Sequence, residues 1–203
     1  MKKSAVKSER KQDKSMSIFA LMGILLAGVL AGTLMYCNID EQHYQNIAAI
    51  TGGLLENRMN YSFREMLVNS FAGSFLLILL CFILGTGPVF QPVELLIPVY
   101  RGLGLGILLA DMYCSFGSYG IIISVLLILP NAVVSAFILL IAVRESIRMS
   151  NSVRKVVFNS DSSYSKIDFS LYFTKFIVII AILALSSLAD SAVTVFLSDI
   201  IIK

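Results

Sequence analysis

Charged side chains are scarce in this chain. They make up 14% of its 203 residues, whereas apolar residues make up 57%. Soluble globular domains carry roughly 25% charged and 45–50% apolar residues. The composition therefore excludes an ordinary water-soluble domain and indicates that lipid is the solvent. The net charge of +3 is modest and gives no indication of a nucleic-acid partner.

The motifs of common enzymes and metal sites are also missing. The three cysteines, Cys37, Cys81 and Cys114, lack the paired CxxC spacing of zinc and redox sites, and we interpret them as packing residues. The single histidine, His43, has no second ligand at a suitable spacing. There is no HExxH, GxSxG or Walker loop. We predict a protein that is not an enzyme and that holds no metal and no cofactor.

Long uncharged runs are what the chain does contain, and about 20 apolar residues suffice to cross a bilayer. They predict an all-α, polytopic integral membrane protein of about five transmembrane helices in one domain, residues 1–203. The predicted helices are 18–37, 69–84, 94–112, 112–143 with a kink or break at Pro130, and 171–198. Residues 88–100 are either a re-entrant piece or the start of the third helix, which contains Pro98.

The positive charges predict an orientation. Residues 1–14 form a basic tail and residues 144–170 a basic loop, and loops rich in Lys and Arg stay in the cytoplasm. We therefore expect a cytoplasmic N-terminus. Residues 38–68 form the sizeable outer segment, with apolar residues at the spacing of an amphipathic interfacial helix. This segment is shorter than chains that usually fold alone, so it is no separate catalytic domain.

Small residues recur every four positions in two of the predicted helices. Gly28 and Gly32 share one face of the first helix, and Gly102, Gly106 and Ala110 share one face of the third. Such faces let two helices approach closely in a membrane. We predict that these two helices pack as a close pair.

Three ionisable residues fall inside predicted spans, where such residues are costly and are functional candidates by default: Arg101, Asp111 and Asp190. Asp190 lies in a polar stripe with Ser187, Ser191 and Thr194, so it belongs either to an ion or proton path or to a packed site near the outer interface. Arg101 is expected to extend to the cytoplasmic headgroups. An intramembrane enzyme would need Asp111 and Asp190 as a pair.

The second half of the chain contains an ordered series of prolines, glycines and polar residues. The series is Pro88, Pro92, Pro98, Arg101-Gly102, Gly106, Gly117, Gly120, Ser124, Leu129-Pro130-Asn131, Ser186-Ser187, Asp190 and Phe196-Leu197-Ser198. In this order the chain resembles the stage II sporulation protein M family of endospore-forming bacteria. The resemblance covers nearly the whole chain and is strong from about residue 66.

The resemblance implies a scaffold of the forespore engulfment machinery in the septal or forespore membrane. Such a scaffold recruits and positions a lytic transglycosylase and an amidase or endopeptidase that degrade peptidoglycan. It singles out Arg101, Gly102, Gly106, Pro130, Asn131 and Asp190. The wider superfamily often places a histidine and an acid after the proline of the fourth helix, and here Asn131, Ala132 and Val133 stand instead.

The alternative hypothesis is a small transporter or channel subunit. It depends on the Asp190 stripe and on helices broken around Pro98 and Pro130, because interrupted helices line the cavities of transporters.

Overall fold

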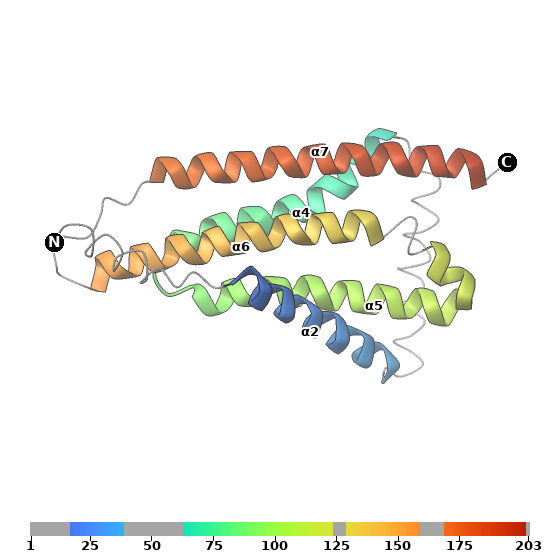
Figure 1. Ribbon diagram of the computed structural model, residues 1–203, viewed down its shortest axis with the longest axis horizontal. Helices are drawn as coiled ribbons and strands as arrows, with labels where there is room; N and C mark the ends of the chain where they lie inside the picture. The colour runs from blue at the N-terminus through green and yellow to red at the C-terminus, as the bar shows by residue number, and fades with distance from the viewer. Residues whose placement is uncertain (1–16, 39–62, 124–128, 159–168, 202–203) are drawn as a thin grey trace, which may run out of the picture.

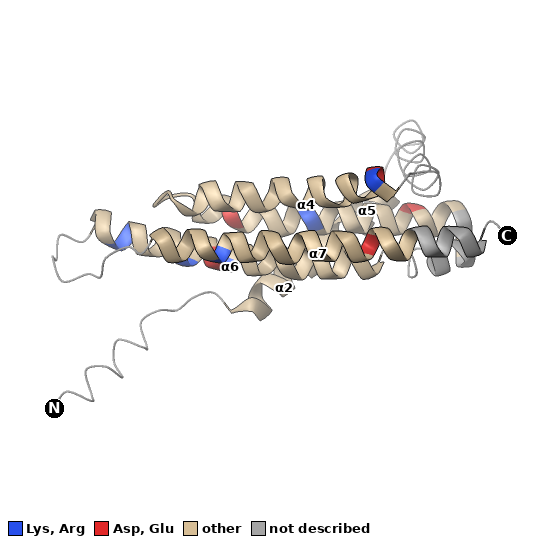
Figure 2. Ribbon diagram, turned by 90° about the horizontal axis from the view of Figure 1, so that it is seen from above, with Lys and Arg blue, Asp and Glu red and all other residues tan. Residues whose placement is uncertain are grey.

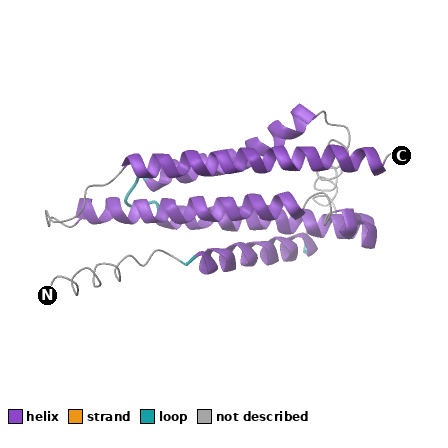
Figure 3. Cartoon of the chain, turned by 45° about the horizontal axis from the view of Figure 1, so that its top comes forward, coloured by secondary structure: helices purple, strands orange, loops and turns teal. Residues whose placement is uncertain are grey.

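The computed structural model describes residues 17–38, 63–123, 129–158 and 169–201, and all regular structure within them is helical (Figures 1 and 3). The helices are α2 (Ile18–Cys37), α4 (Phe63–Gly85), α5 (Gln91–Ile123), α6 (Leu129–Phe158) and α7 (Phe169–Ile201). Helices α2 and α4, with Gln91–Ser115 of α5 and Phe169–Thr194 of α7, are long and apolar enough to cross a membrane. The prediction of an all-α, polytopic membrane protein is confirmed.

The outer surface of the bundle is apolar. Large apolar side chains are exposed on the flanks of the bundle, among them Leu30, Leu34, Leu76, Leu185 and Val193. Soluble proteins rarely expose such contiguous apolar surfaces. Charged residues are few along the helices and occupy separate positions (Figure 2). The surface therefore suits contact with lipid acyl chains on its flanks.

Helix α6 is the centre of the bundle and packs against each of the other four helices. In Figure 1 it lies between α4 and α7 on one side and α5 and α2 on the other. Its most buried residues include Ala142, Val143 and Ser146. Helix α6 is not among the helices that are long and apolar enough to be assigned as membrane spans from composition. It nevertheless packs along α7, with contacts from Asn131 to Glu145. Its burial explains why it tolerates more polar residues than its neighbours.

Side-chain contacts give the direction of each helix. Asn131 of α6 meets Asp190 of α7, and Glu145 meets Lys175, so these two helices are antiparallel. In α2, Thr33 contacts Gly106 and Tyr36 contacts Asp111, so α2 and α5 are parallel. Helices α2, α5 and α7 thus run one way, and α4 and α6 run the other. This alternation is what consecutive membrane crossings produce.

The two faces of small residues lie against each other in the structure. A side chain added at Gly28 or Gly32 would meet the backbone of Val99 or Leu103, and one added at Gly106 would meet the backbone carbonyl of Val29. Ala110 is buried on the same helix, α5. Thr33 Oγ1 also lies 3.4 Å from the Gly106 carbonyl oxygen. The absence of Cβ atoms is therefore what lets α2 and α5 make backbone contact.

Two prolines do not interrupt helices as the sequence predicted. Helix α5 continues from Gln91 through Pro98, so residues 91–100 are part of the helix and not a re-entrant piece. Pro130 stands in the first turn of α6, where a missing backbone N–H breaks no helical hydrogen bond. The prediction of one helix over 112–143 with a kink or break at Pro130 is wrong, because residues 112–123 belong to α5 and α6 begins at Leu129. The interruption lies instead in α5 at Gly117, whose φ of 58° favours glycine.

Several predicted boundaries shift. Helix α4 begins at Phe63, so residues 63–68 of the predicted outer segment belong to it. Helix α6 continues to Phe158, so the predicted basic loop 144–170 begins as helix. The basic tail 1–14, His43 and the rest of the outer segment up to residue 62, apart from Asn38, lie outside the described residues. Of the cysteines, Cys81 is buried, whereas Cys37 and Cys114 are exposed and do not pack in the core.

Candidate functional site

Asp190 joins three helices through hydrogen bonds. Its Oδ2 accepts one from Ser70 Oγ of α4 at 2.7 Å and one from Asn131 Nδ2 of α6 at 2.9 Å. We call Ser70, Asn131 and Asp190 the Asp190 cluster. Hydrogen bonds to a charged acceptor are stronger than neutral ones. The cluster therefore fastens α4, α6 and α7 together.

The polar stripe on α7 faces the inside of the bundle. Ser187, Ser191 and Thr194 are all buried. Ser191 donates its hydroxyl proton to the Ser187 carbonyl oxygen of its own helix, at 2.9 Å. Of the two interpretations of this stripe, a packed site is favoured, because Asp190 hydrogen-bonds Ser70 and Asn131 of neighbouring helices.

Arg101 does not extend to the headgroups. Its Nη2 donates to Ser135 Oγ of α6 at 2.8 Å, and Ser135 is buried. Ser135 lies one helical turn, about 6 Å, from Asn131. The guanidinium thus points away from the start of α5 and toward the level of the Asp190 cluster. The expectation that Arg101 reaches the cytoplasmic surface is wrong, because α6 offers the side chain a polar partner inside the bundle.

Asp111 belongs to the α2–α5 pair. It is 1% exposed, and its Oδ1 accepts a hydrogen bond from Tyr36 Oη of α2 at 2.7 Å. Ser115 Oγ, one turn further along α5, lies 3.5 Å from the same oxygen. Asp111 and Asp190 therefore bind partners on different pairs of helices. This arrangement gives no support to chemistry that needs the two acids as a pair.

Replacing Tyr36 by phenylalanine should weaken the α2–α5 pair. The change keeps the ring but removes the hydroxyl that binds buried Asp111, and losing one partner of a buried polar group costs about 1–3 kcal/mol. Unfolding by SDS from mild-detergent micelles measures the effect. Tyr100→Phe, on an exposed ring of α5, is the control and should leave the free energy of unfolding unchanged. Equal effects of the two changes would contradict the role of the Tyr36 hydroxyl.

A fourth ionisable residue inside the bundle, Glu94, was not identified from the sequence. Its side chain is 0% exposed. Ser146 Oγ of α6 lies 3.0 Å from Glu94 Oε1 and 2.6 Å from the Cys81 carbonyl oxygen of α4. Tyr172 Oη of α7 donates to the Phe82 carbonyl oxygen at 2.9 Å and lies 3.5 Å from that of Cys81. We call Glu94, Ser146 and Tyr172, with these two carbonyls, the Glu94 cluster.

Helical spacing could have located Glu94. It stands seven residues before Arg101 and so shares its face of α5. From the sequence, residues 88–100 are either a re-entrant piece or the start of a helix, so Glu94 has no defined environment at that level. A continuous helix through Pro98 would have placed it inside.

The Asp190 and Glu94 clusters lie near opposite ends of the bundle. Tyr172 and Asp190 are eighteen residues apart on α7, or about 27 Å. The hydrocarbon core of a bilayer is about 30 Å thick. With the predicted orientation, the Glu94 cluster is near the cytoplasmic boundary and the Asp190 cluster near the outer one. Helix α6 contacts Glu94 through Ser146, Arg101 through Ser135 and Asp190 through Asn131.

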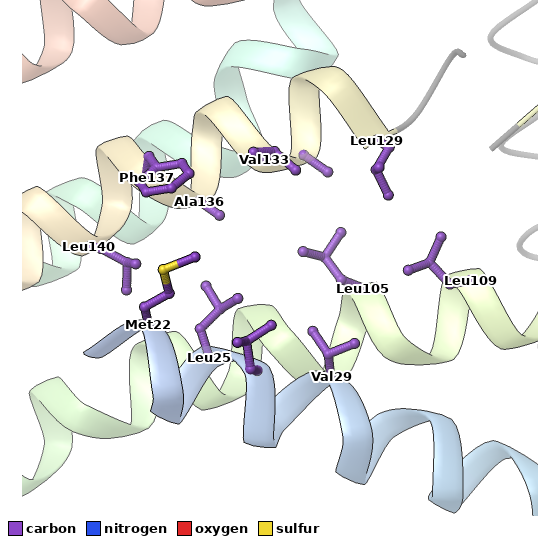
Figure 4. Close-up of a pocket in the computed structure, with 12 residues that line it drawn as sticks. Met22, Leu25, Val29, Leu105, Leu109, Leu129, Val133, Ala136, Phe137 and Leu140 are labelled. Carbon is purple, nitrogen blue, oxygen red and sulfur yellow. The ribbon is translucent and has the colours of Figure 1, made fainter. Parts of the chain in front are cut away.

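An apolar groove of about 230 Å³ separates α2 and α5 from α6 (Figure 4). Met22, Leu105, Val133 and Phe137 are among the side chains that point into it. Each of its lining residues is apolar. The groove therefore provides no group for acid–base or nucleophilic chemistry.

Comparisons with models of protein families, with curated proteins and with solved structures found no match for this chain.

Proposed function

We propose that this protein is a non-enzymatic membrane scaffold of the forespore engulfment machinery, which recruits and positions peptidoglycan hydrolases at the septal or forespore membrane. The partners are a lytic transglycosylase and an amidase or endopeptidase. The membrane lipids are its other partner. The proposal takes the machinery and the partners from the family resemblance.

One structural observation favours a scaffold over a transporter or channel. Asp111, Asp190 and Arg101 each hydrogen-bond a residue of a neighbouring helix. These contacts join helices α2 with α5, α4 with α6 and α7, and α5 with α6. Polar contacts between membrane helices act as glue and fix their arrangement. A fixed arrangement suits a platform that holds other proteins in place.

The contact surface for the hydrolases is proposed to be the outer segment 38–68 together with the outer helix ends. These residues flank α2 and α4 in the chain. Photo-crosslinkers placed singly in this segment should capture a hydrolase during sporulation. Crosslinkers at lipid-facing positions such as Leu30 or Leu76 serve as matched controls, because these side chains are exposed on the flank of the bundle.

The decisive experiment combines binding and localisation. Detergent-solubilised protein should retain both hydrolases in a pull-down, and in a deletion strain the hydrolases should lose their place at the septum. Asp190→Asn is expected to preserve both results, since an asparagine there still offers a hydrogen-bond acceptor to Ser70. Failure of the pull-down, together with normal hydrolase localisation in the deletion strain, would overturn the scaffold proposal.

The second candidate function is a small transporter or channel subunit that uses Asp190. The observation in its favour is the Asp190 cluster itself, an acid with buried hydroxyls beside it on α7. Against it, α5 and α6 are not broken at Pro98 and Pro130. Flux through proteoliposomes that Asp190→Asn abolishes, with hydrolase binding intact, would favour transport. Absence of flux with wild-type protein would remove it.

A further inference from the structure

The Glu94 cluster contains a carboxyl oxygen without a partner. Glu94 is fully buried, and its Oε2 has no hydrogen-bond partner among the described residues. An ionised carboxylate that is buried without a compensating cation or a full set of hydrogen bonds is strongly destabilising, because its lost hydration is not recovered. The stability of the cluster therefore depends on the protonation state of Glu94.

The number of protons available to the hydrogen bonds of the cluster indicates the protonation state of Glu94. The Ser146 hydroxyl has one proton and lies within hydrogen-bond distance of two acceptors, the Cys81 carbonyl oxygen at 2.6 Å and Glu94 Oε1 at 3.0 Å. A backbone carbonyl only accepts, so the shorter contact takes the serine proton. The contact with Glu94 is then a hydrogen bond only if the carboxyl group supplies the proton.

The proton of the other hydroxyl in the cluster is directed to a different acceptor. Tyr172 donates its phenol proton to the Phe82 carbonyl oxygen at 2.9 Å. Gly85 is packed so closely that a Cβ atom on it would lie 2.8 Å from Ser146 Oγ, which shows how little space remains beside the hydroxyl. Each donor of the cluster other than the carboxyl group therefore already has an acceptor.

We propose that Glu94 is a buried proton-binding site. In the folded protein its carboxyl group is neutral and donates to Ser146 Oγ, which in turn donates to the Cys81 carbonyl oxygen. This chain of hydrogen bonds connects α5, α6 and α4. Without this proton, Ser146 would have to donate to Glu94 and no longer to the Cys81 carbonyl oxygen, and the carboxylate would be a buried charge. Proton binding therefore stabilises the contact between these helices.

The titratable neighbours do not neutralise a charge on Glu94. On α4 the neighbour is Cys81, on α7 it is Tyr172, and both are neutral in their usual state. On α6, Glu145 directly precedes Ser146 in the chain, but it forms an ion pair with Lys175 of α7. Lys175 is thus engaged by another carboxylate.

Polar side chains lie at the end of the bundle next to Glu94. Gln91 precedes Glu94 by one turn on α5, and its Nε2 donates to Asn151 Oδ1 at 2.8 Å. Arg154 donates to Gln91 Oε1 at 3.3 Å and to Asn151 Oδ1 at 3.1 Å, and its contacts there are exposed. These side chains stand at the end of the bundle next to Glu94, the cytoplasmic end in the predicted orientation, so exchange of the proton with water is expected at this end.

Infrared spectroscopy of the reconstituted wild-type protein tests the proposal directly. At neutral pH the carbonyl-stretch band of a protonated carboxylic acid should be present, and labelling the glutamate carboxyl carbons with ¹³C should shift it. Glu94→Gln should remove this band, because its amide keeps a donor for Ser146 but carries no acid. The control Glu145→Gln, which removes an ion-paired carboxylate, should leave the band in place. A spectrum without a label-sensitive acid band in the wild type would overturn the proposal.

The pH dependence of stability is the second measurement. Unfolded glutamate loses its proton near about pH 4.3. Because the folded state keeps the proton to higher pH, it binds more protons than the unfolded state, and stability falls as pH rises above that value. The ratio of folded to unfolded protein should fall up to about tenfold per pH unit until Glu94 is deprotonated. Glu94→Gln should lack this component, whereas Glu145→Gln should retain it. Identical pH profiles for wild type and Glu94→Gln would contradict proton binding at Glu94.

Discussion

Replacing Gly106 by alanine should lower the free energy of unfolding by about 2–3 kcal/mol, the upper range for an overpacked site. The added methyl group would collide with the Val29 carbonyl oxygen and lie 3.0 Å from the Thr33 backbone nitrogen. Backbone atoms of a helix cannot move aside as a flexible side chain can. Helix α2 would therefore be pushed away from α5, and the Tyr36–Asp111 hydrogen bond would be lost with the contact.

Gly104 provides a matched control on the same helix. A Cβ atom there meets nothing within 4 Å. Gly104→Ala should instead stabilise α5 slightly, by about 0.5–1 kcal/mol, because alanine favours the helix over glycine. Unfolding by SDS compares the two variants under the same conditions, and a crosslink between α2 and α5 reports their separation. Equal effects of the two substitutions would show that small residues do not set the α2–α5 distance.

Replacing Asp190 by leucine should cost about 3 kcal/mol or more. It removes two hydrogen bonds to a charged acceptor, each worth about 1.5–3 kcal/mol, and leaves Ser70 and Asn131 without this partner. A more apolar side chain would by itself favour the membrane, so a loss of stability has to come from these contacts between helices. Unfolding by SDS again gives the free energy, and circular dichroism checks that the helices form.

Two further variants separate the charge of Asp190 from its hydrogen bonds. Asp190→Asn keeps an acceptor oxygen and should cost about 1 kcal/mol, the usual value of one neutral hydrogen bond. Leu188→Ala changes an exposed, lipid-facing side chain of the same helix and should stay within about 0.5 kcal/mol of wild type. A leucine variant as stable as wild type would show that the Asp190 cluster does not hold α4, α6 and α7 together.

These results bear on the two proposals in different ways. A destabilised Asp190→Leu that still binds hydrolases agrees with a scaffold in which the acid serves packing. The proton-binding site at Glu94 stands apart from both functions, because its test reads a carboxyl proton and not a partner or a flux. A failure of the hydrolase pull-down would therefore leave it intact.

The sequence alone determined the approximate place of the apolar helices other than the fourth, the small faces of the α2–α5 pair and the polar character of the α7 stripe. These features follow from local rules: a span needs about 20 apolar residues, and small residues four apart share one helix face. Gly28, Gly32, Gly102 and Gly106 are therefore identifiable before any contact is known.

Only the tertiary structure decided where the ionisable side chains point and what they bind. Arg101 turns to Ser135 and not to the headgroups, since the alternative depends on whether a neighbouring helix offers an acceptor at the right depth. Pro98 and Pro130 fail to break helices, because the cost of a missing N–H depends on its position and on the packing around it. The buried environment of Glu94 is formed by α4, α6 and α7 together with its own helix, α5. The Glu94 carboxyl oxygen without a partner among the described residues depends on four helices together, and no pattern within one helix encodes it.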